Sequence, residues 1–206
     1  MKKIHVKVTT LAPMLGSQPN NPELHEAYIA SKAPDAMSLE EEVAAVGAAE
    51  VVEQSMTVFH RHDKKPVLMD YQIKGFFKDT CGAMRKLPNT KSSKIKAYKK
   101  EIDSLIFVEP RFIPIDFTGE MTTCQRPLRA STPMGERVAL ANSEQIPEGA
   151  QLEFDVLCLA DGYVDVVKEW LLYGHMRGLG QWRNSGMGRF KHEIVSIEDV
   201  EDPFRV

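Results

Sequence analysis

Apolar and polar residues alternate in a period of two near the start of the chain and again near its end. β-Branched residues alternate with polar ones from residue 4 to residue 10, which predicts a half-buried strand over 4–10. The same alternation predicts a strand over 152–158, and a further strand is expected over 191–197. Shorter apolar runs bounded by turn-forming residues predict strands over 56–60, 66–70, 105–108 and 111–117.

Other segments have the period of a helix. Apolar residues recur at spacings of three and four over residues 73–87, which predicts an amphipathic helix. Lys74, Lys78 and Arg85 fall together on another face of this helix. Capping residues and apolar stripes predict two further helices, over 39–53 and 163–176.

Two long polar stretches separate these elements. No period is visible over 18–38, and threonine, arginine and proline dominate 118–135. Both are interpreted as loops inserted into a single domain, because 206 residues is the length of one domain. Short strands that alternate with few helices favour an α+β or α/β sheet.

Charge is low overall but unevenly distributed. The net charge of −3 excludes a protein that binds polyanions through bulk charge. Residues 85–100 nevertheless carry seven basic side chains and no acidic one. This stretch predicts either a contact with a polyanion or a solvated loop without a partner. No apolar run reaches the ~18 residues that span a bilayer, and no signal peptide is recognisable, so a cytoplasmic protein is expected.

A glycine-rich segment follows the predicted helix 163–176 and precedes the predicted strand 191–197. A dinucleotide-binding fingerprint has the reverse order, and a phosphate-binding P-loop ends in Gly-Lys-Ser/Thr, so both are excluded. Backbone amides beside guanidinium groups suit phosphates, and an exposed indole suits base stacking. The alternative is a tight connection with its tryptophan in the core. The residues concerned are Arg177, Gly178, Gly180, Trp182, Arg183, Gly186, Gly188 and Arg189.

Signals for metal or catalytic chemistry are weak. His60 and His62 could present two imidazoles on one face of a strand, but no third ligand is apparent. A charged hairpin turn explains this pattern equally well. The three cysteines are too far apart in sequence for a zinc ribbon or a disulfide scaffold, and the sequence contains no common hydrolase motif. Neither a metal nor a cofactor is expected.

Four segments of the chain carry motifs that resemble, in the same order, those of one known protein family. Thr10-Leu-Ala-Pro-Met-Leu-Gly-Ser17 follows the first strand, and Pro66-Val-Leu-Met-Asp-Tyr-Gln-Ile-Lys-Gly-Phe-Phe-Lys78 contains a strand and a helix start. Gln145-Ile-Pro-Glu-Gly-Ala-Gln-Leu-Glu-Phe154 leads into a late strand, and Gly178 to Phe190 is a terminal glycine-rich loop. Together these motifs resemble the RAMP superfamily of CRISPR interference complexes, and most of all its repeated backbone subunit.

The resemblance implies a ferredoxin-like or RRM-like βαββαβ core with an antiparallel sheet and insertions. It also implies that a basic face and the glycine-rich loop hold single-stranded guide RNA, and that the partners are copies of this chain or other CRISPR-type subunits. The loop 118–135 would be the hairpin that inserts between nucleotides. The implied RNA-binding residues are Lys74, Lys78, Arg85, Arg126, Arg129, Arg177, Gly178, Gly180, Trp182, Arg183, Gly186, Gly188 and Arg189.

Two alternative functions stay open. One is a protein-interaction module, or a mimic of a CRISPR subunit, that keeps the fold without binding RNA. The other is a metal-dependent endoribonuclease that uses Asp35 and His25, although no local motif supports it. The chain is short and acidic for a backbone subunit, which would suit a solitary or virus-encoded relative.

Overall fold

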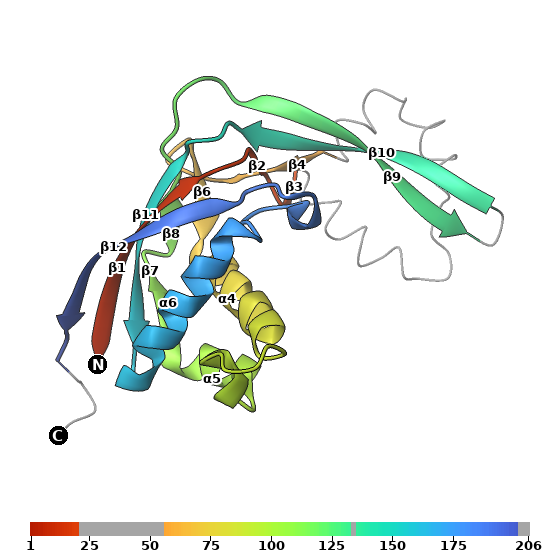
Figure 1. The fold of residues 1–206 in the computed structure, drawn as a ribbon. Coiled ribbons are helices and arrows are strands. Elements are labelled where there is room, and N and C mark those ends of the chain that lie inside the picture. The colour runs from red at the N-terminus through yellow and green to blue at the C-terminus, as the bar shows by residue number, and fades with distance from the viewer. Residues whose placement is uncertain (21–55, 133–134, 202–206) are drawn as a thin grey trace, which may run out of the picture. The chain divides into compact units, whose positions relative to one another are not determined.

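The computed structural model describes residues 1–20, 56–132 and 135–201 (Figure 1). The predicted helix 39–53 and the candidate residues His25 and Asp35 lie outside these ranges. The chain divides into two compact units. Unit 1 comprises Met1–Met14, His60–Glu120 and Ile146–Val206, and unit 2 comprises Leu15–Phe59 and Met121–Gln145. The described parts of the two predicted insertions fall mainly in unit 2.

Unit 1 contains a four-stranded antiparallel sheet with two helices against one face (Figure 1). Its strands are β1 (Lys2–Thr10), β7 (Ile106–Glu109), β11 (Gln151–Cys158) and β12 (Phe190–Asp199), and the helices are α4 (Asp70–Met84) and α6 (Val164–Leu172). The strand order is β12-β1-β11-β7, and every neighbouring pair is antiparallel. Along the chain these elements run strand, helix, strand, strand, helix, strand. The prediction of an α+β fold with an antiparallel sheet is confirmed.

The period of two on β1 places its apolar side chains beneath the helices. Ile4, Val6 and Val8 have no exposed surface, while the polar residues between them are half-buried on the open face. Aromatic residues complete the core. The Phe77 ring lies 5.4 Å from Trp170, which joins α4 to α6 by an apolar contact.

The helices differ from their predicted bounds at the ends. The helix α4 begins three residues earlier than predicted, where the Met69 backbone N–H donates to the Gln72 side chain at 2.7 Å. The predicted helix 163–176 is split, because α6 is flanked by 3-10 turns Asp161–Tyr163 and Tyr173–His175. A helix that the sequence analysis does not predict, α5 (Tyr98–Leu105), begins within the last residues of the basic stretch.

A smaller sheet of unit 1 is formed by β5 (His60–His62), β6 (Lys65–Met69) and β8 (Phe112–Pro114), in the order β5-β6-β8. Its hairpin turns over two residues rather than over the predicted 61–65. Every helix in the described part of the chain is too short or too polar to traverse a bilayer.

Unit 2 is built around a hairpin, at residues that the sequence analysis interprets as an inserted loop and, from the RAMP resemblance, as a protruding hairpin. Strand β9 (Thr122–Thr132) pairs with β10 (Gly135–Ile146) along its whole length, so most of 118–135 is paired strand rather than irregular loop. Polar residues and Pro127 interrupt any apolar period in β9, so this strand has no local sequence signal. It is stabilised by its pairing with β10. The strands β2 (Met14–Leu15), β3 (Gln18–Pro19) and β4 (Thr57–Val58) complete a five-stranded sheet.

Candidate nucleic-acid interface

The two lysines predicted on α4 contact α5. The Lys78 Nζ lies 2.5 Å from a carboxylate oxygen of Asp103. The Lys74 Nζ donates to the Asp103 backbone carbonyl at 3.2 Å and lies 4.8 Å from the centroid of the Phe107 ring. Burial lowers the pKa of Lys74, against the opposing effect of the Asp103 carboxylate. Both lysines therefore tie α4 to α5, and Lys78 is neutralised by a carboxylate.

Two of the arginines predicted to bind RNA share one carboxylate on α4. The Arg177 Nε and the Arg183 Nη1 both donate to Asp79, the second at 3.2 Å. Arg177 also donates to the Asn184 side-chain oxygen at 2.9 Å. These bonds fix the glycine-rich turn, which Arg177 precedes, to α4, so the guanidinium groups position the turn as well as carrying charge.

The outer glycines of the turn serve backbone packing. A Cβ on Gly178 would lie 2.1 Å from the Gly188 carbonyl carbon, and one on Gly188 would lie 2.0 Å from the Leu179 carbonyl oxygen. The Leu179 N–H donates to the Gly188 carbonyl at 3.0 Å, which closes the turn. For these two glycines, the structural interpretation from the sequence analysis is correct.

The middle of the turn opens to solvent. Trp182 is 40% exposed, so the alternative that places it in the core is wrong. Its backbone has a positive φ of 53°, which is uncommon for a residue with a side chain. A hollow of about 280 Å³ lies beside it, lined by Arg177, Gly180, Gln181, Trp182, Arg183 and Asn184. Gly180 and Gly186 also have positive φ, and Arg189 is exposed.

The remaining predicted arginines lie in different environments. Arg126 is only 7% exposed and donates to the Ser143 hydroxyl at 3.0 Å, so it holds β9 to β10, and an RNA contact by this residue stays a prediction. A buried guanidinium needs such partners, and the polar strands of unit 2 supply them. Arg129 lies on β9 opposite Val138. Arg85 follows the last residue of α4 and lies 5.1 Å from the Tyr98 ring centroid.

The basic segment, residues 85–100, is anchored to α6 by a partly buried hydrogen-bond network. Glu169 accepts hydrogen bonds from the backbone N–H groups of Lys91 and Ser92, at 2.7 and 3.1 Å. The Ser92 hydroxyl donates to the same carboxylate at 2.5 Å and accepts from the Trp170 indole at 2.9 Å. The network gives the segment a defined path. The Glu169 carboxylate accepts from two backbone N–H groups and the Ser92 hydroxyl rather than from lysine side chains.

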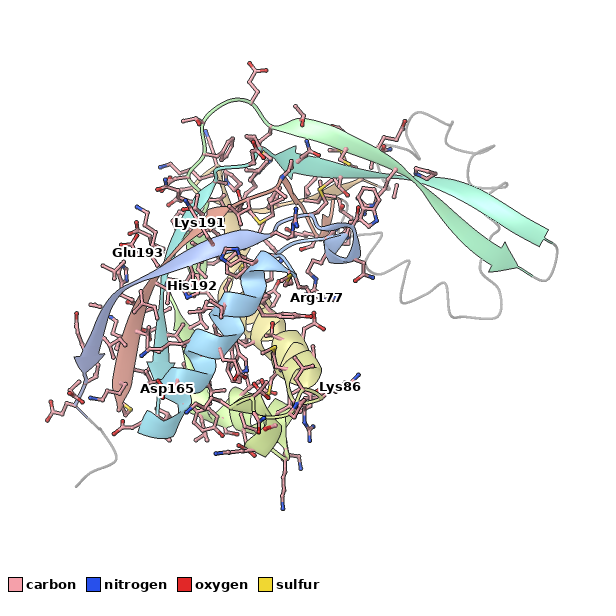
Figure 2. The ribbon with its side chains drawn as sticks, viewed as in Figure 1. Lys86, Asp165, Arg177, Lys191, His192 and Glu193 are labelled. Atoms are coloured by element: carbon pink, nitrogen blue, oxygen red, sulfur yellow. The ribbon has the colours of Figure 1, made fainter. Side chains whose placement is uncertain are left out.

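The lysines of the basic segment point to solvent. Lys91 lies 3.9 Å from Asp165, a long ion pair between exposed groups. Within the described residues the other five have no ion-pair partner, and all are exposed: Lys86, Lys94, Lys96, Lys99 and Lys100. Figure 2 shows Lys86 beyond the C-terminal end of α4. The sequence analysis singled out this stretch by its charge but assigned no RNA contact to these lysines.

The open face of the four-stranded sheet is occupied by ion pairs. Lys3 and His5 both contact Asp155 at 2.7 Å, and Lys7 lies 3.0 Å from Glu153. Burial alone would raise the pKa of Asp155, but hydrogen bonds from Lys3 and His5 outweigh it and hold the pKa below its usual value. No phenylalanine, tyrosine or tryptophan lies on β1 or on the open face of β11, so these two central strands lack the aromatic residues with which RRM sheets stack bases. The edge strand β7 carries Phe107, which is 39% exposed and lies opposite Leu157.

No family model matches the chain, and no curated protein matches it. One solved structure that does match is a chain in the cryo-EM structure of the Type III-B Cmr-beta bound to cognate target RNA, with 13% identity and a TM-score of 0.49. The match covers 96% of this chain and 60% of the other, so this chain spans about 60% of that neighbour's length. Membership of the RAMP superfamily stays a prediction.

Proposed function

We propose that this chain binds single-stranded RNA through the basic segment, with the glycine-rich turn as a neighbouring contact. One observation carries the proposal: six lysines of the segment are exposed, and no acidic residue interrupts them. Exposed lysines on a fixed backbone can neutralise phosphates and release the counterions condensed on a strand. The choice of RNA over DNA rests on the RAMP resemblance.

The glycine-rich turn adds a different kind of contact. The Trp182 indole is exposed beside a hollow with guanidinium groups in its wall, and bases of any sequence stack on such a ring. Asp79, which holds the turn, precedes the end of α4 by five residues, or about 8 Å of helix axis. A single strand that follows α4 from the turn would reach the basic segment.

The roles of the predicted residues change accordingly. Lys78, Arg177 and Arg183 are each paired with a carboxylate, so their main contribution is to hold α5 and the turn in place. The same pairing is the observation that favours the second candidate function, a protein-interaction module. That alternative predicts a protein without bound nucleic acid. Reversing the charge of its lysines would then change no RNA affinity.

Salt-dependent binding of a labelled single-stranded RNA, followed by fluorescence anisotropy, tests the proposal. The variant reverses three lysines, Lys94→Glu, Lys96→Glu and Lys99→Glu, and the matched control is Lys191→Glu, an exposed lysine on β12 (Figure 2). Each phosphate contact changes the slope of log K against log salt by about 0.7 for a single strand. We expect the triple variant to flatten the slope by about 2 and the control to leave it unchanged.

Two outcomes would contradict the RNA-binding proposal. If the wild-type protein shows no binding at 50 mM salt, the exposed lysines do not form an RNA site. If the triple variant binds as tightly as the control, RNA binds elsewhere. A DNA strand of the same sequence, measured in parallel, separates RNA recognition from general binding of phosphates.

A further inference from the structure

A cluster of aromatic rings lies on the three-stranded sheet of unit 1, outside the surface proposed above. Strands β5 and β6 join through Asp63 and Lys64, which both have positive φ, at 49° and 66°. This is the backbone of a tight type I′ hairpin. Strand β8 pairs with β6 on the other side, and β6 leads directly into α4. The cluster is therefore carried by short, hydrogen-bonded elements.

Four rings contact one another in two pairs. The His62 imidazole stacks on the Phe112 ring with centroids 4.1 Å apart and planes 4° apart. His60 meets Tyr71 edge-on, with centroids 6.2 Å apart, and its Nε2 lies 2.9 Å from the tyrosine oxygen. These contacts orient the rings before any ligand arrives, which lowers the entropic cost of binding one.

The rings remain open to solvent in spite of these contacts. Tyr71 is 47% exposed and Phe112 is 39% exposed, while His62 is exposed and His60 is half-buried. Burial lowers the pKa of His60, which favours the neutral imidazole, so this ring adds aromatic surface. Aromatic side chains normally stabilise a fold by burial, so four rings gathered at a surface indicate a partner.

Basic side chains surround the rings. The Arg111 guanidinium lies 5.5 Å from the Tyr71 ring centroid and pairs with Asp70 at 2.7 Å. Asp63, in the hairpin turn, lies 3.6 Å from His62. Lys64 and Lys65 are exposed in and next to the same turn, and Lys65 pairs with His62 across the hairpin, so positive charge is available close to the rings.

A metal ion is another ligand that two neighbouring histidines suggest, but the side chains are already engaged. The His60 Nε2 contacts a hydroxyl, and the His62 ring stacks on a phenylalanine. The described part of the chain contains no group of three histidine, cysteine or carboxylate side chains able to hold a metal. Exposed aromatic rings with cations nearby suit a planar, anionic ligand instead.

We propose that His60, His62, Tyr71 and Phe112 form a stacking surface for the bases of single-stranded nucleic acid, with the surrounding cations on its phosphates. Bases of every type have a face on which a ring can stack, so this contact tolerates sequence changes. The site uses none of the lysines in residues 85–100, and it stands or falls independently of them.

Binding of two strands by the full chain tests the site. One strand is a 12-nucleotide oligoadenylate, and the other is an abasic strand of the same length, which keeps the phosphates without bases. In the double variant Tyr71→Ala, Phe112→Ala we expect oligoadenylate affinity to fall about tenfold or more, with abasic-strand affinity unchanged. The matched control is Leu172→Ala, which removes a side chain that is 64% exposed on α6 and should change neither affinity.

A second variant keeps the test decisive if the double variant fails to fold. Tyr71→Trp, made in a Trp182→Phe background, places an indole at the site. The other remaining tryptophan, Trp170, is buried, so the new indole is the exposed one. We expect oligoadenylate to quench its fluorescence and the abasic strand not to do so. Absence of quenching, or an equal loss of affinity for both strands in a folded double variant, overturns the proposal. Competition by oligoglutamate as strong as by oligoadenylate overturns it too, since the surface would then recognise an acidic peptide.

Reversing Lys94, Lys96 and Lys99 separates this site from the proposed function. That triple variant should weaken both strands to the same extent, because its effect is on phosphates. If it has no effect while the stacking variants lose oligoadenylate, the basic segment is not the RNA site but the aromatic cluster is one. The reverse pattern would support the basic segment as the RNA site and would overturn the aromatic stacking surface.

Discussion

At the scale of single residues, the tightest constraint in the glycine-rich turn is at Gly188. It has φ of 67°, and an added Cβ would lie 2.0 Å from the Leu179 carbonyl oxygen. Left-handed backbone costs a residue with a side chain about 1–2 kcal/mol, and the backbone clash adds to this. We expect Gly188→Ala to lower the free energy of unfolding in urea by at least about 2 kcal/mol. Gly162→Ala is the matched control, because nothing lies within 4 Å of its added Cβ; an equal loss in both variants would contradict the assignment.

A second residue-scale prediction concerns the pH dependence of stability. The pKa of Asp155 is lowered in the folded state by hydrogen bonds from Lys3 and His5, which overcome the raising effect of burial. The folded protein therefore binds protons less readily at this carboxyl than the unfolded chain does. Its stabilisation is present above about pH 4 and is lost as pH falls through the lowered pKa. Asp155→Asn should be less stable at pH 7 and should lose less stability on acidification, as measured by urea unfolding at pH 7 and pH 3. A parallel loss in the wild type and the variant would contradict this.

At the scale of elements, the path of the basic segment depends on Glu169 of α6. Its carboxylate accepts bonds from two backbone N–H groups and the Ser92 hydroxyl, and leaving such donors unpaired costs about 1–3 kcal/mol. We expect Glu169→Ala to release the segment, so that trypsin cleaves within residues 85–100 several-fold faster than in the wild type. Glu198→Ala, an exposed glutamate on β12, is the control and should keep the wild-type rate. Unchanged cleavage in Glu169→Ala would show that the segment is held by other contacts.

How much of each element could be predicted depended on whether its signal was local. The strands β1 and β11 bury every second residue, so a period of two identified them. The helix α5 was missed, because its helical period is carried by a single buried residue, Ile102, in a run of charged side chains. Strand β9 is stabilised by pairing with β10, and no local pattern reports a partner strand.

The candidate site shows the same limit. Sequence showed which residues were basic, but the pairing of Arg177 and Arg183 with Asp79 joins positions about a hundred residues apart. Whether a guanidinium is free for a phosphate is therefore a property of the folded chain. The exposure of the lysines in residues 85–100 could be predicted better, because this stretch contains no acidic residue that could pair with them locally.

At the scale of the whole molecule, the proposal requires RNA to bind a protein of net charge −3. Screening limits the interaction of exposed charges to about 8 Å at physiological salt, so a phosphate senses the lysines near it more than the total charge. Binding to the folded state alone also raises stability. At an RNA concentration of one hundred times Kd, the gain is about 2.7 kcal/mol, or a Tm increase of about 5–11 °C for a chain of this size. We expect this increase at 50 mM salt for the wild type and Lys191→Glu, and its loss in the triple lysine variant. An increase that persists at 1 M salt would show that phosphate contacts are not what holds the RNA, because charge-driven binding is lost there.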